Sequence, residues 1–343
     1  MKNSGKLLSA VLALICSFAN HAFADTTLIN GAGATFPYPL YSKWFSDYRK
    51  IDPSVEINYQ SIGSGGGIRQ LLEKTVDFGA SDAPMTTEEL AKSSVPVLHI
   101  PTVLGAVVVT YNIPGVEKNI KLTPEIIAGM YLGTVNKWDD EKIAAANPGV
   151  TFPKDTPIVV AYRSDGSGTN AIFTDYLAKV SPEFKEKVGA GKSVKWPVGL
   201  GGKGNEGVTG LVKQTPGTVG YVELIYAETN KLPVATIKNK DGSFVAPTTK
   251  SVTAAAQGAL KSMPADFRVS ITDAGGKESY PISGFTYLLV YQKMDSTKGP
   301  KLVKFLNWAL GDGQKNAEPL AYAPLPKSLV AKVKSKIKTI KTN

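Results

Sequence analysis

Three glycine-rich segments in this chain each follow a run of residues typical of a β-strand and precede a run typical of a helix. They occupy residues 31–36, 63–67 and 165–169, and each contains a serine or threonine. Strands that alternate with helices form the layered sheets of α/β folds, and the turns between them gather at the carboxyl edge of a sheet. Such a turn also exposes backbone N–H groups and the positive end of a helix dipole. Three of them together predict an α/β fold with a binding site for a small oxyanion.

The rest of the chain continues the alternation of strands and helices. Strand-like runs occupy residues 27–29, 55–59, 76–82, 157–162, 219–222 and 285–291, and helix-like runs occupy residues 39–49, 68–75, 123–132, 140–146, 170–180, 305–310 and 327–341. Thr86 and Glu89 have the spacing of a capping box at the start of another helix. The run 97–111 fits a long strand that passes from one domain to another, although Pro101 and Gly105 interrupt it. We therefore expect parallel sheets flanked by helices, in two domains.

The N-terminus has the layout of a secretory signal peptide. Basic residues precede an apolar run at residues 7–18, and a small-residue cleavage site ends at Ala24. The apolar run is too short to span a membrane. Cys16 is the single cysteine, and Ile15 before it is larger than the residue that a lipoprotein signal has there. We therefore expect cleavage after Ala24, no lipid anchor, and an exported chain that folds without disulfides.

The positive net charge of the chain favours anionic partners but does not indicate nucleic acid. The chain contains 39 lysine and arginine residues against 29 acidic residues, for a formal net charge of +10. The basic residues are spread along the chain among acidic ones, and the sequence carries no nucleic-acid recognition motif. The densest basic run, residues 327–341, is expected to form a terminal helix with one apolar face. We expect no nucleic-acid partner.

The residues that common catalytic and metal sites require are scarce. After the predicted signal peptide the sequence holds one histidine, His99, in an apolar run where a structural role is expected. A cysteine nucleophile and a His/Cys metal cluster are excluded, and a serine triad would depend on His99. An enzyme based on aspartate or lysine is not excluded by composition, although no motif supports one. We expect no enzymatic activity and no bound metal.

Two glycine patterns match the fingerprint of dinucleotide-binding loops without its context. Gly166, Gly168 and Ala171 lie in the middle of the chain, and no acidic residue ends the next strand. Residues 199–204 contain a similar pattern in what is expected to be another glycine-rich loop. The sequence therefore predicts no nicotinamide or flavin cofactor.

Arg163 ends a strand-like run just before the third glycine-rich segment. Its planar guanidinium suits a tetrahedral oxyanion, and Asp165 could pair with it and fix its orientation. An ordinary surface ion pair is the alternative. Ser167 and Thr169 can donate hydroxyl hydrogen bonds to the same anion, although Thr169 could instead cap the following helix. These residues form the expected donor side of the site.

Asp82 ends another strand at the same edge of the sheet, so its carboxylate is expected to face the anion. A helix cap is the alternative role. Phosphate near neutral pH carries a proton that it can donate to this carboxylate, whereas sulfate has none. A buried carboxylate without a donor would cost several kcal/mol of binding free energy, on the order of a thousandfold in affinity. Asp82 would therefore admit phosphate and reject sulfate.

Several longer motifs resemble a single protein family. The motifs at residues 31–37, 76–84, 163–169, 194–205 and 216–223 resemble the periplasmic phosphate-binding protein of bacterial phosphate ABC importers, the PstS family. The resemblance covers essentially the whole chain after residue 24. It implies a two-domain, hinged periplasmic binding protein of type II, with mixed, mostly parallel sheets flanked by helices and the ligand in the interdomain cleft. Domain I would contain residues 25–103 and 276–343, and domain II residues 104–275.

The resemblance also implies a set of ligand-binding residues and partners. The family's phosphate contacts fall on Thr35, Phe36, Ser64, Asp82, Arg163, Ser167, Gly168 and Thr169, with Asp165 supporting Arg163. Gly65 stands where many relatives have a second serine, and because glycine keeps the backbone donor we expect a small effect on affinity. The expected protein is a periplasmic monomer without a cofactor. It would bind inorganic phosphate with high affinity and deliver it to the membrane permease of an ABC transporter.

Two other functions stay open at this point. The site could take another tetrahedral oxyanion, such as sulfate or molybdate. The chain could also be a secreted phosphatase, although no metal cluster and no histidine near the three segments supports phosphoryl transfer.

Overall fold

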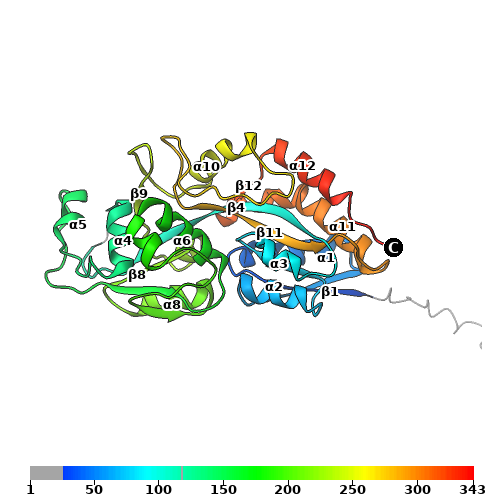
Figure 1. Ribbon diagram of the computed structural model, residues 1–343, viewed down its shortest axis with the longest axis horizontal. Coiled ribbons are helices and arrows are strands. Elements are labelled where there is room, and N and C mark those ends of the chain that lie inside the picture. The colour runs from blue at the N-terminus through cyan, green and yellow to red at the C-terminus, as the bar shows by residue number, and fades with distance from the viewer. Residues whose placement is uncertain (1–25, 117–118) are drawn as a thin grey trace, which may run out of the picture.

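Two long antiparallel strands, β4 (Val97–Tyr111) and β11 (Ser283–Tyr291), run through the middle of the molecule and connect two lobes (Figure 1). The computed structural model describes residues 26–116 and 119–343. The predicted signal peptide, residues 1–24, lies outside the described residues. Within those described ranges, no helix is both long enough and apolar enough to cross a membrane.

The main sheet is mixed, with the strand order β2-β1-β3-β11-β4-β8-β6-β7 and with β12 beside β4. Its other strands are β1 (Thr27–Gly33), β2 (Val55–Ser61), β3 (Phe78–Ser81), β6 (Val159–Arg163), β7 (Leu200–Gly202), β8 (Thr218–Glu223) and β12 (Ala323–Pro324). A second sheet contains β5 (Lys121–Leu122), β9 (Thr236–Lys238) and β10 (Phe244–Val245). Strand β1 is parallel to β2 and β3, and β6 is parallel to β7 and β8, whereas β4 and β11 are antiparallel to their neighbours. The predicted parallel pairing therefore holds in the outer parts of the sheet.

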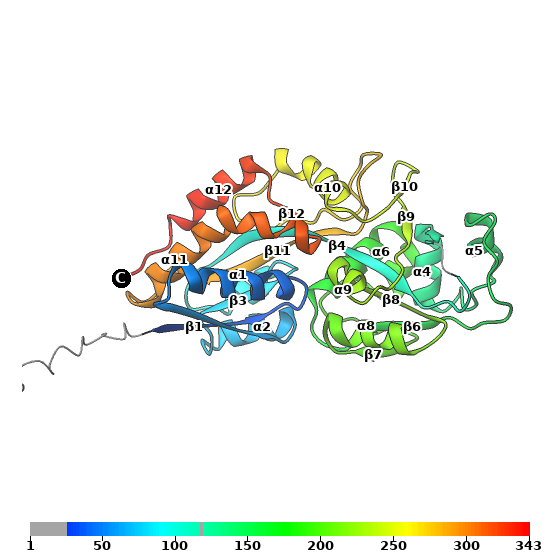
Figure 2. The same cartoon turned by 180° about the vertical axis from the view of Figure 1, so that it is seen from behind.

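Helices cover the sheet in three groups (Figures 1 and 2). The β1 lobe contains β1–β3 with α1 (Tyr38–Ile51), α2 (Ser64–Leu72) and α3 (Thr87–Ala91). The β8 lobe contains β6–β8 with α4 (Pro124–Leu132), α5 (Glu141–Ala146), α6 (Gly168–Val180), α7 (Pro182–Lys187), α8 (Gly204–Gln214) and α9 (Leu224–Thr229). The third group is α10 (Thr249–Lys261), α11 (Lys298–Ala309) and α12 (Lys327–Ile337), with the 3-10 turns η1 (Asp312–Asn316) and η2 (Glu318–Leu320).

Strand β4 has the predicted bounds and belongs to both lobes. Residues 97–106 pair with β11, and residues 107–111 pair with β8. Almost the whole strand is buried, and most of its side chains are apolar, as expected of a strand that is covered on both faces. The chain passes from one lobe to the other where the pairing partner changes, between Ala106 and Val107.

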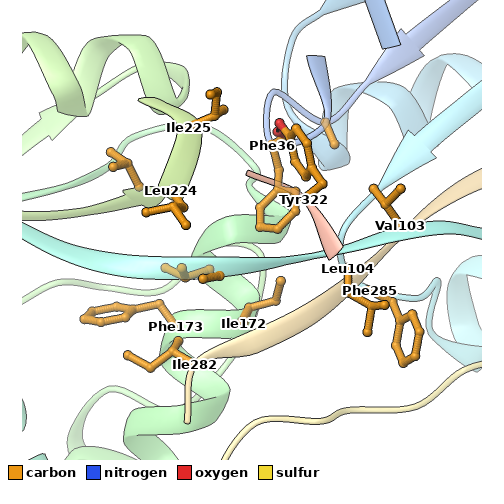
Figure 3. Packing of buried hydrophobic residues seen from close by; sticks show 14 of the residues in the cluster. Phe36, Val103, Leu104, Ile172, Phe173, Leu224, Ile225, Ile282, Phe285 and Tyr322 are labelled. Carbon is orange, nitrogen blue, oxygen red and sulfur yellow. Dashed lines mark hydrogen bonds between the residues drawn. The ribbon is translucent and has the colours of Figure 1, made fainter. Parts of the chain in front are cut away.

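Side chains from distant parts of the sequence pack around this crossing (Figure 3). Phe36 lies beside Tyr322, with ring centroids 6.2 Å apart. Ile172 comes from α6, and Phe285 from β11. All four are buried. Since Phe36 belongs to the first glycine-rich segment and Ile172 to the helix after the third, this cluster fixes both segments relative to β4.

Two local predictions are confirmed around α3. Thr86 Oγ1 accepts a hydrogen bond from the Glu89 N–H, and a Glu89 carboxylate oxygen accepts one from the Thr86 N–H, as a capping box requires. His99 is buried, and its Nε2 accepts a hydrogen bond of 2.9 Å from the Met85 N–H. Burial lowers the pKa of His99 to about 4, so the ring is neutral and structural.

Helix α2 begins four residues earlier than predicted, inside the second glycine-rich segment. Glycine disfavours helices, which is why the sequence places the start at residue 68. Gly67 lies where α2 packs against β1, and a Cβ at this position would be 2.4 Å from the Ala32 carbonyl oxygen. Only glycine allows the helix this close to the strand. The close approach places Ser64 at the helix start, at the carboxyl edge of the sheet.

Other departures have a similar origin in tertiary contacts. Residues 200–202 form β7 instead of a loop, because they pair in parallel with β6. Helices α7, α9 and α10 have no counterpart among the predicted helices. The terminal helix α12 is confirmed, and Leu329, Val333 and Ile337 form its buried face.

Gly67→Ala should lower the free energy of unfolding by about 2–3 kcal/mol, because the added methyl would press on the backbone of β1. Gly210→Ala in α8 is the matched control, since a Cβ there has no atom within 4 Å. In a helix interior this control should stabilise the protein by up to about 1 kcal/mol. Urea unfolding monitored by circular dichroism measures both values. Equal effects of the two substitutions would contradict the close packing of α2 on β1.

Candidate anion-binding site

The second and third glycine-rich segments meet where the two lobes face each other. The Gly65 N–H donates to the Gly166 carbonyl oxygen at 2.7 Å, and the Gly168 N–H donates to Ser64 Oγ at 3.0 Å. Ser64 begins α2 in the β1 lobe, and Gly168 begins α6 in the β8 lobe. Two helix N-termini therefore converge on one place, as the sequence predicts for an anion site.

Gly168 allows this convergence because its Cα lies against the Asp82 side chain. A Cβ at residue 168 would lie 2.5 Å from Oδ2 of Asp82 and 2.5 Å from Ser64 Oγ. Any larger residue would push the two lobes apart at this point. The glycine is thus required by close approach, and the dinucleotide-like spacing of Gly166 and Gly168 has no further part in the site.

Asp82 is a buried carboxylate at the centre of the contacts. Its Oδ1 accepts a hydrogen bond of 2.8 Å from Thr286 Oγ1, and Ser64 Oγ lies 3.5 Å from Oδ2. Burial raises the pKa of Asp82 to about 7, although the Thr286 hydrogen bond and the Arg163 charge act against the increase. Asp82 is not a helix cap, because Thr86 caps α3. The site therefore contains one carboxylate that can accept or hold a proton near neutral pH.

Arg163 faces the same region from the end of β6. Its Nε and Nη2 donate to the two carboxylate oxygens of Asp165 at 2.8 and 2.7 Å. The Arg163 side chain is 1% exposed, so the pair is not an ordinary surface ion pair. Burial alone would raise the pKa of Asp165, but the Arg163 pair and the Gly204 N–H lower it overall. Among the described residues, Nη1 of Arg163 has no hydrogen-bond partner.

Ser167 and Thr169 lie at the start of α6 and are both buried. Ser167 Oγ accepts a hydrogen bond of 3.0 Å from the Asn170 N–H, so Ser167 is the N-cap of this helix. The alternative role of Thr169 as the cap is therefore wrong. Each hydroxyl keeps its own proton as a possible donor to a ligand.

Thr35 and Phe36 bring the first glycine-rich segment to the site. The Tyr226 hydroxyl donates to the Thr35 carbonyl oxygen at 2.6 Å, and the Tyr322 hydroxyl donates to the Phe36 carbonyl oxygen at 2.6 Å. The Phe36 ring is fully buried beside β4, so Phe36 can face the site only through its backbone. These bonds hold the loop after β1 in one position.

Two further residues complete the arrangement and were not among the predicted site residues. Asn205, at the start of α8, donates from Nδ2 to Thr35 Oγ1 at 2.7 Å and to Thr169 Oγ1 at 3.2 Å. Thr286, on β11, holds Asp82. Neither residue lies in one of the three glycine-rich segments, and Thr286 lies inside a strand. The glycine-rich run before Asn205 was the one available signal. Within the described ranges, no group of acidic, histidine or cysteine residues could hold a metal ion.

Comparison with known proteins identifies the family of this chain. Residues 20–312 match the profile of the PBP superfamily domain. The phosphate-binding protein PstS of Pasteurella multocida is 43% identical over 332 residues, which cover 95% of each chain. The phosphate-binding protein PstS of Xylella fastidiosa strain Temecula1 is 44% identical over 309 residues, which cover 90% of this chain and 84% of that one. The chain belongs to the PstS family. This chain and these two relatives are similar along most of their lengths.

Solved structures show the same fold as this PstS family member. The phosphate-binding protein of Stenotrophomonas maltophilia superposes with a TM-score of 0.71 at 22% identity, covering 90% of this chain and 93% of that one. The periplasmic phosphate-binding protein PfluDING, solved with phosphate, superposes with a TM-score of 0.70 at 23% identity and the same coverage. The predicted α/β fold of a type II periplasmic binding protein is confirmed.

The raised pKa of Asp82 predicts a pH-dependent stability for the phosphate-free protein. Between pH 4 and pH 7 the folded state would hold a proton on Asp82 that the unfolded state has lost, so the free energy of unfolding should fall as pH rises. Asp82→Asn removes this dependence. The free energy of unfolding of the wild type, minus that of the variant, should fall by at most about 4 kcal/mol between pH 4 and pH 8. Urea unfolding at several pH values measures it, and parallel pH curves would contradict the assignment.

Proposed function

We propose that this protein binds inorganic phosphate between the β1 and β8 lobes and delivers it to the membrane permease of an ABC transporter. The observation that carries the proposal is that a buried acceptor, the Asp82 carboxylate, lies among buried donors from both lobes. One of these donors, Nη1 of Arg163, has no partner among the described residues. Membership of the PstS family, whose curated members are named as phosphate-binding proteins, supports it.

The balance of donors and acceptors fits a protonated tetrahedral anion. The proposed contacts are the predicted residues Thr35, Phe36, Ser64, Asp82, Arg163, Ser167, Gly168 and Thr169, with Asp165 holding Arg163. Hydroxyls, backbone N–H groups and the guanidinium all donate to anionic oxygens. Asp82 alone accepts, so the anion must bring a proton unless Asp82 carries it. Hydrogen phosphate meets this requirement by itself, whereas sulfate meets it only where Asp82 is protonated, which becomes the minor form above pH 7.

Binding would involve closure of two hinged domains. We assign residues 25–103 and 276–343 to domain I and residues 104–275 to domain II, with the hinge at β4 and β11. The point where β4 changes its partner strand, between Ala106 and Val107, lies three residues beyond this boundary. Contacts between the lobes support a closed form. Besides the Gly65–Gly166 hydrogen bond, Lys192 Nζ lies 2.8 Å from Glu89 Oε2, and both side chains are largely buried. Closure would remove water from the anion and strengthen its charge-assisted hydrogen bonds.

The proposed function also implies where the protein works and in what oligomeric state. A signal peptide cleaved after Ala24 would export the chain to the periplasm, where it would work as a monomer without a cofactor.

The rival function, a secreted phosphatase, requires turnover of a phosphate ester. A chromogenic phosphate ester incubated with the protein at several pH values should give no product above the rate without protein, and saturable release of product would favour the enzyme.

Calorimetry with phosphate and sulfate tests the proposed function. At pH 8 the wild type should bind phosphate in about one-to-one stoichiometry and prefer it to sulfate by at least about tenfold, because only the minor protonated form of Asp82, whose pKa is about 7, can donate to sulfate. Asp82→Asn should reduce this preference by at least about tenfold, because a neutral amide can donate to sulfate. Asp175→Asn is the matched control, since Asp175 is held by the Ser270 and Thr272 hydroxyls outside the glycine-rich segments. Comparable wild-type affinities for the two anions would refute the phosphate assignment.

A further inference from the structure

Asn205 has a hydrogen-bond arrangement that fixes the orientation of its amide. The residue is completely buried at the start of α8. Its Oδ1 accepts a hydrogen bond of 2.9 Å from the Glu223 N–H. A backbone N–H can only donate, so the amide oxygen must face Glu223. The NH2 group must therefore face the two threonine hydroxyls, Thr35 Oγ1 at 2.7 Å and Thr169 Oγ1 at 3.2 Å.

This orientation determines what the two hydroxyls can do. A hydroxyl has one proton to donate and two lone pairs that accept. Thr35 Oγ1 accepts from Asn205 twice, from the side-chain amide and from the backbone N–H at 3.1 Å. Both of its lone pairs are thus occupied, and its remaining capacity is its proton. Thr169 Oγ1 also accepts from the amide, so its proton is likewise free for another acceptor.

We propose that Asn205 is a positioning residue that makes Thr35 an obligatory donor toward the bound anion and, by occupying one lone pair of Thr169, turns the Thr169 proton toward the anion as well. The inference rests on the proposed function and adds a residue outside the proposed contact set. With the Thr35 hydroxyl limited to donation, the Asp82 carboxylate is left as the acceptor that faces the anion. Asn205 thereby excludes arrangements in which Thr35 accepts the proton of the anion in place of Asp82. It also links the lobes, because Thr35 belongs to the β1 lobe and Thr169 to the β8 lobe.

Two replacements of Asn205 separate this role from simple packing. Asn205→Asp keeps the shape but reverses the polarity, since a carboxylate accepts from the hydroxyls and draws their protons away from the anion. It also places a negative charge beside an anion, which weakens binding by itself, so the coupling between Asn205→Ala and Thr169→Val separates the positioning role from the effect of charge. Asn205→Ala removes the amide but leaves the threonine protons free. The proposal therefore predicts that the aspartate variant binds phosphate more weakly than the alanine variant. A packing role predicts the reverse, because aspartate fills the space.

Calorimetric titration with inorganic phosphate measures the difference. At pH 8 we expect a loss of about a hundredfold or more for Asn205→Asp, equivalent to two charge-assisted hydrogen bonds, and of about tenfold for Asn205→Ala. As pH falls toward 5, the aspartate variant should recover affinity relative to the wild type, because a protonated carboxyl can donate again. The alanine variant should keep a constant ratio to the wild type. An alanine variant weaker than the aspartate variant would overturn the proposal.

Asn147→Asp is a control for the burial of a new carboxylate. Asn147 is buried away from the site, where its amide donates to the Lys121 and Ile143 carbonyl oxygens. The Asn147→Asp substitution should lower the free energy of unfolding without causing the pH-dependent loss of phosphate affinity.

A wild type that gives no binding heat with phosphate would refute the proposed function itself. Normal wild-type binding with the reversed order of the Asn205 variants would refute only the role of Asn205.

A set of neutral variants keeps the proposal testable if Asn205→Asp does not fold. Thr169→Val removes one of the two hydroxyls that Asn205 orients. Combined with Asn205→Ala, it should show coupling, so that the loss of the amide costs a smaller factor in phosphate affinity once the hydroxyl is absent. Strictly multiplicative effects of the two substitutions would contradict the proposed positioning role.

Discussion

The burial of the Asp82 carboxylate is the constraint on which the site depends. An isolated buried carboxylate is costly, and proteins retain one only where hydrogen bonds and opposite charge compensate it. Here Thr286 donates to Asp82 directly and the Arg163 charge acts on it from the other lobe. The compensation is incomplete, and the pKa of Asp82 stays raised to about 7. A ligand that donates a hydrogen bond to Asp82 supplies the remaining compensation for the buried carboxylate.

The compensating groups come from both lobes, so the site exists only where the lobes meet. Strand β4 joins the lobes by pairing with β11 along one part and with β8 along the rest. Gly168 lets α6 approach Asp82, and Gly67 lets α2 approach β1. Asn205 then connects the threonines of the two lobes. Backbone geometry thus sets the position of the donors, and hydrogen-bond polarity sets their direction.

Much of this was predictable from local sequence, and the remainder depends on contacts between distant segments. The bounds of β4, the capping box of α3 and the gathering of the three glycine-rich segments follow from apolar periodicity and turn chemistry. The start of α2 was missed because glycine lowers helix propensity, whereas Gly67 serves packing. Thr286 and Asn205 were missed because their partners are 204 and 170 residues away along the chain. No local pattern reports such a partner.

A crystal structure of the protein with phosphate, grown near pH 8 without sulfate, tests the central claim most directly. The account predicts one phosphate between the lobes, with a carboxylate oxygen of Asp82 within about 3 Å of a phosphate oxygen. Nη1 of Arg163 and the hydroxyls of Thr35 and Thr169 should lie at similar distances from the other oxygens. A phosphate bound elsewhere, or bound between the lobes with Asp82 turned away from it, would contradict the account.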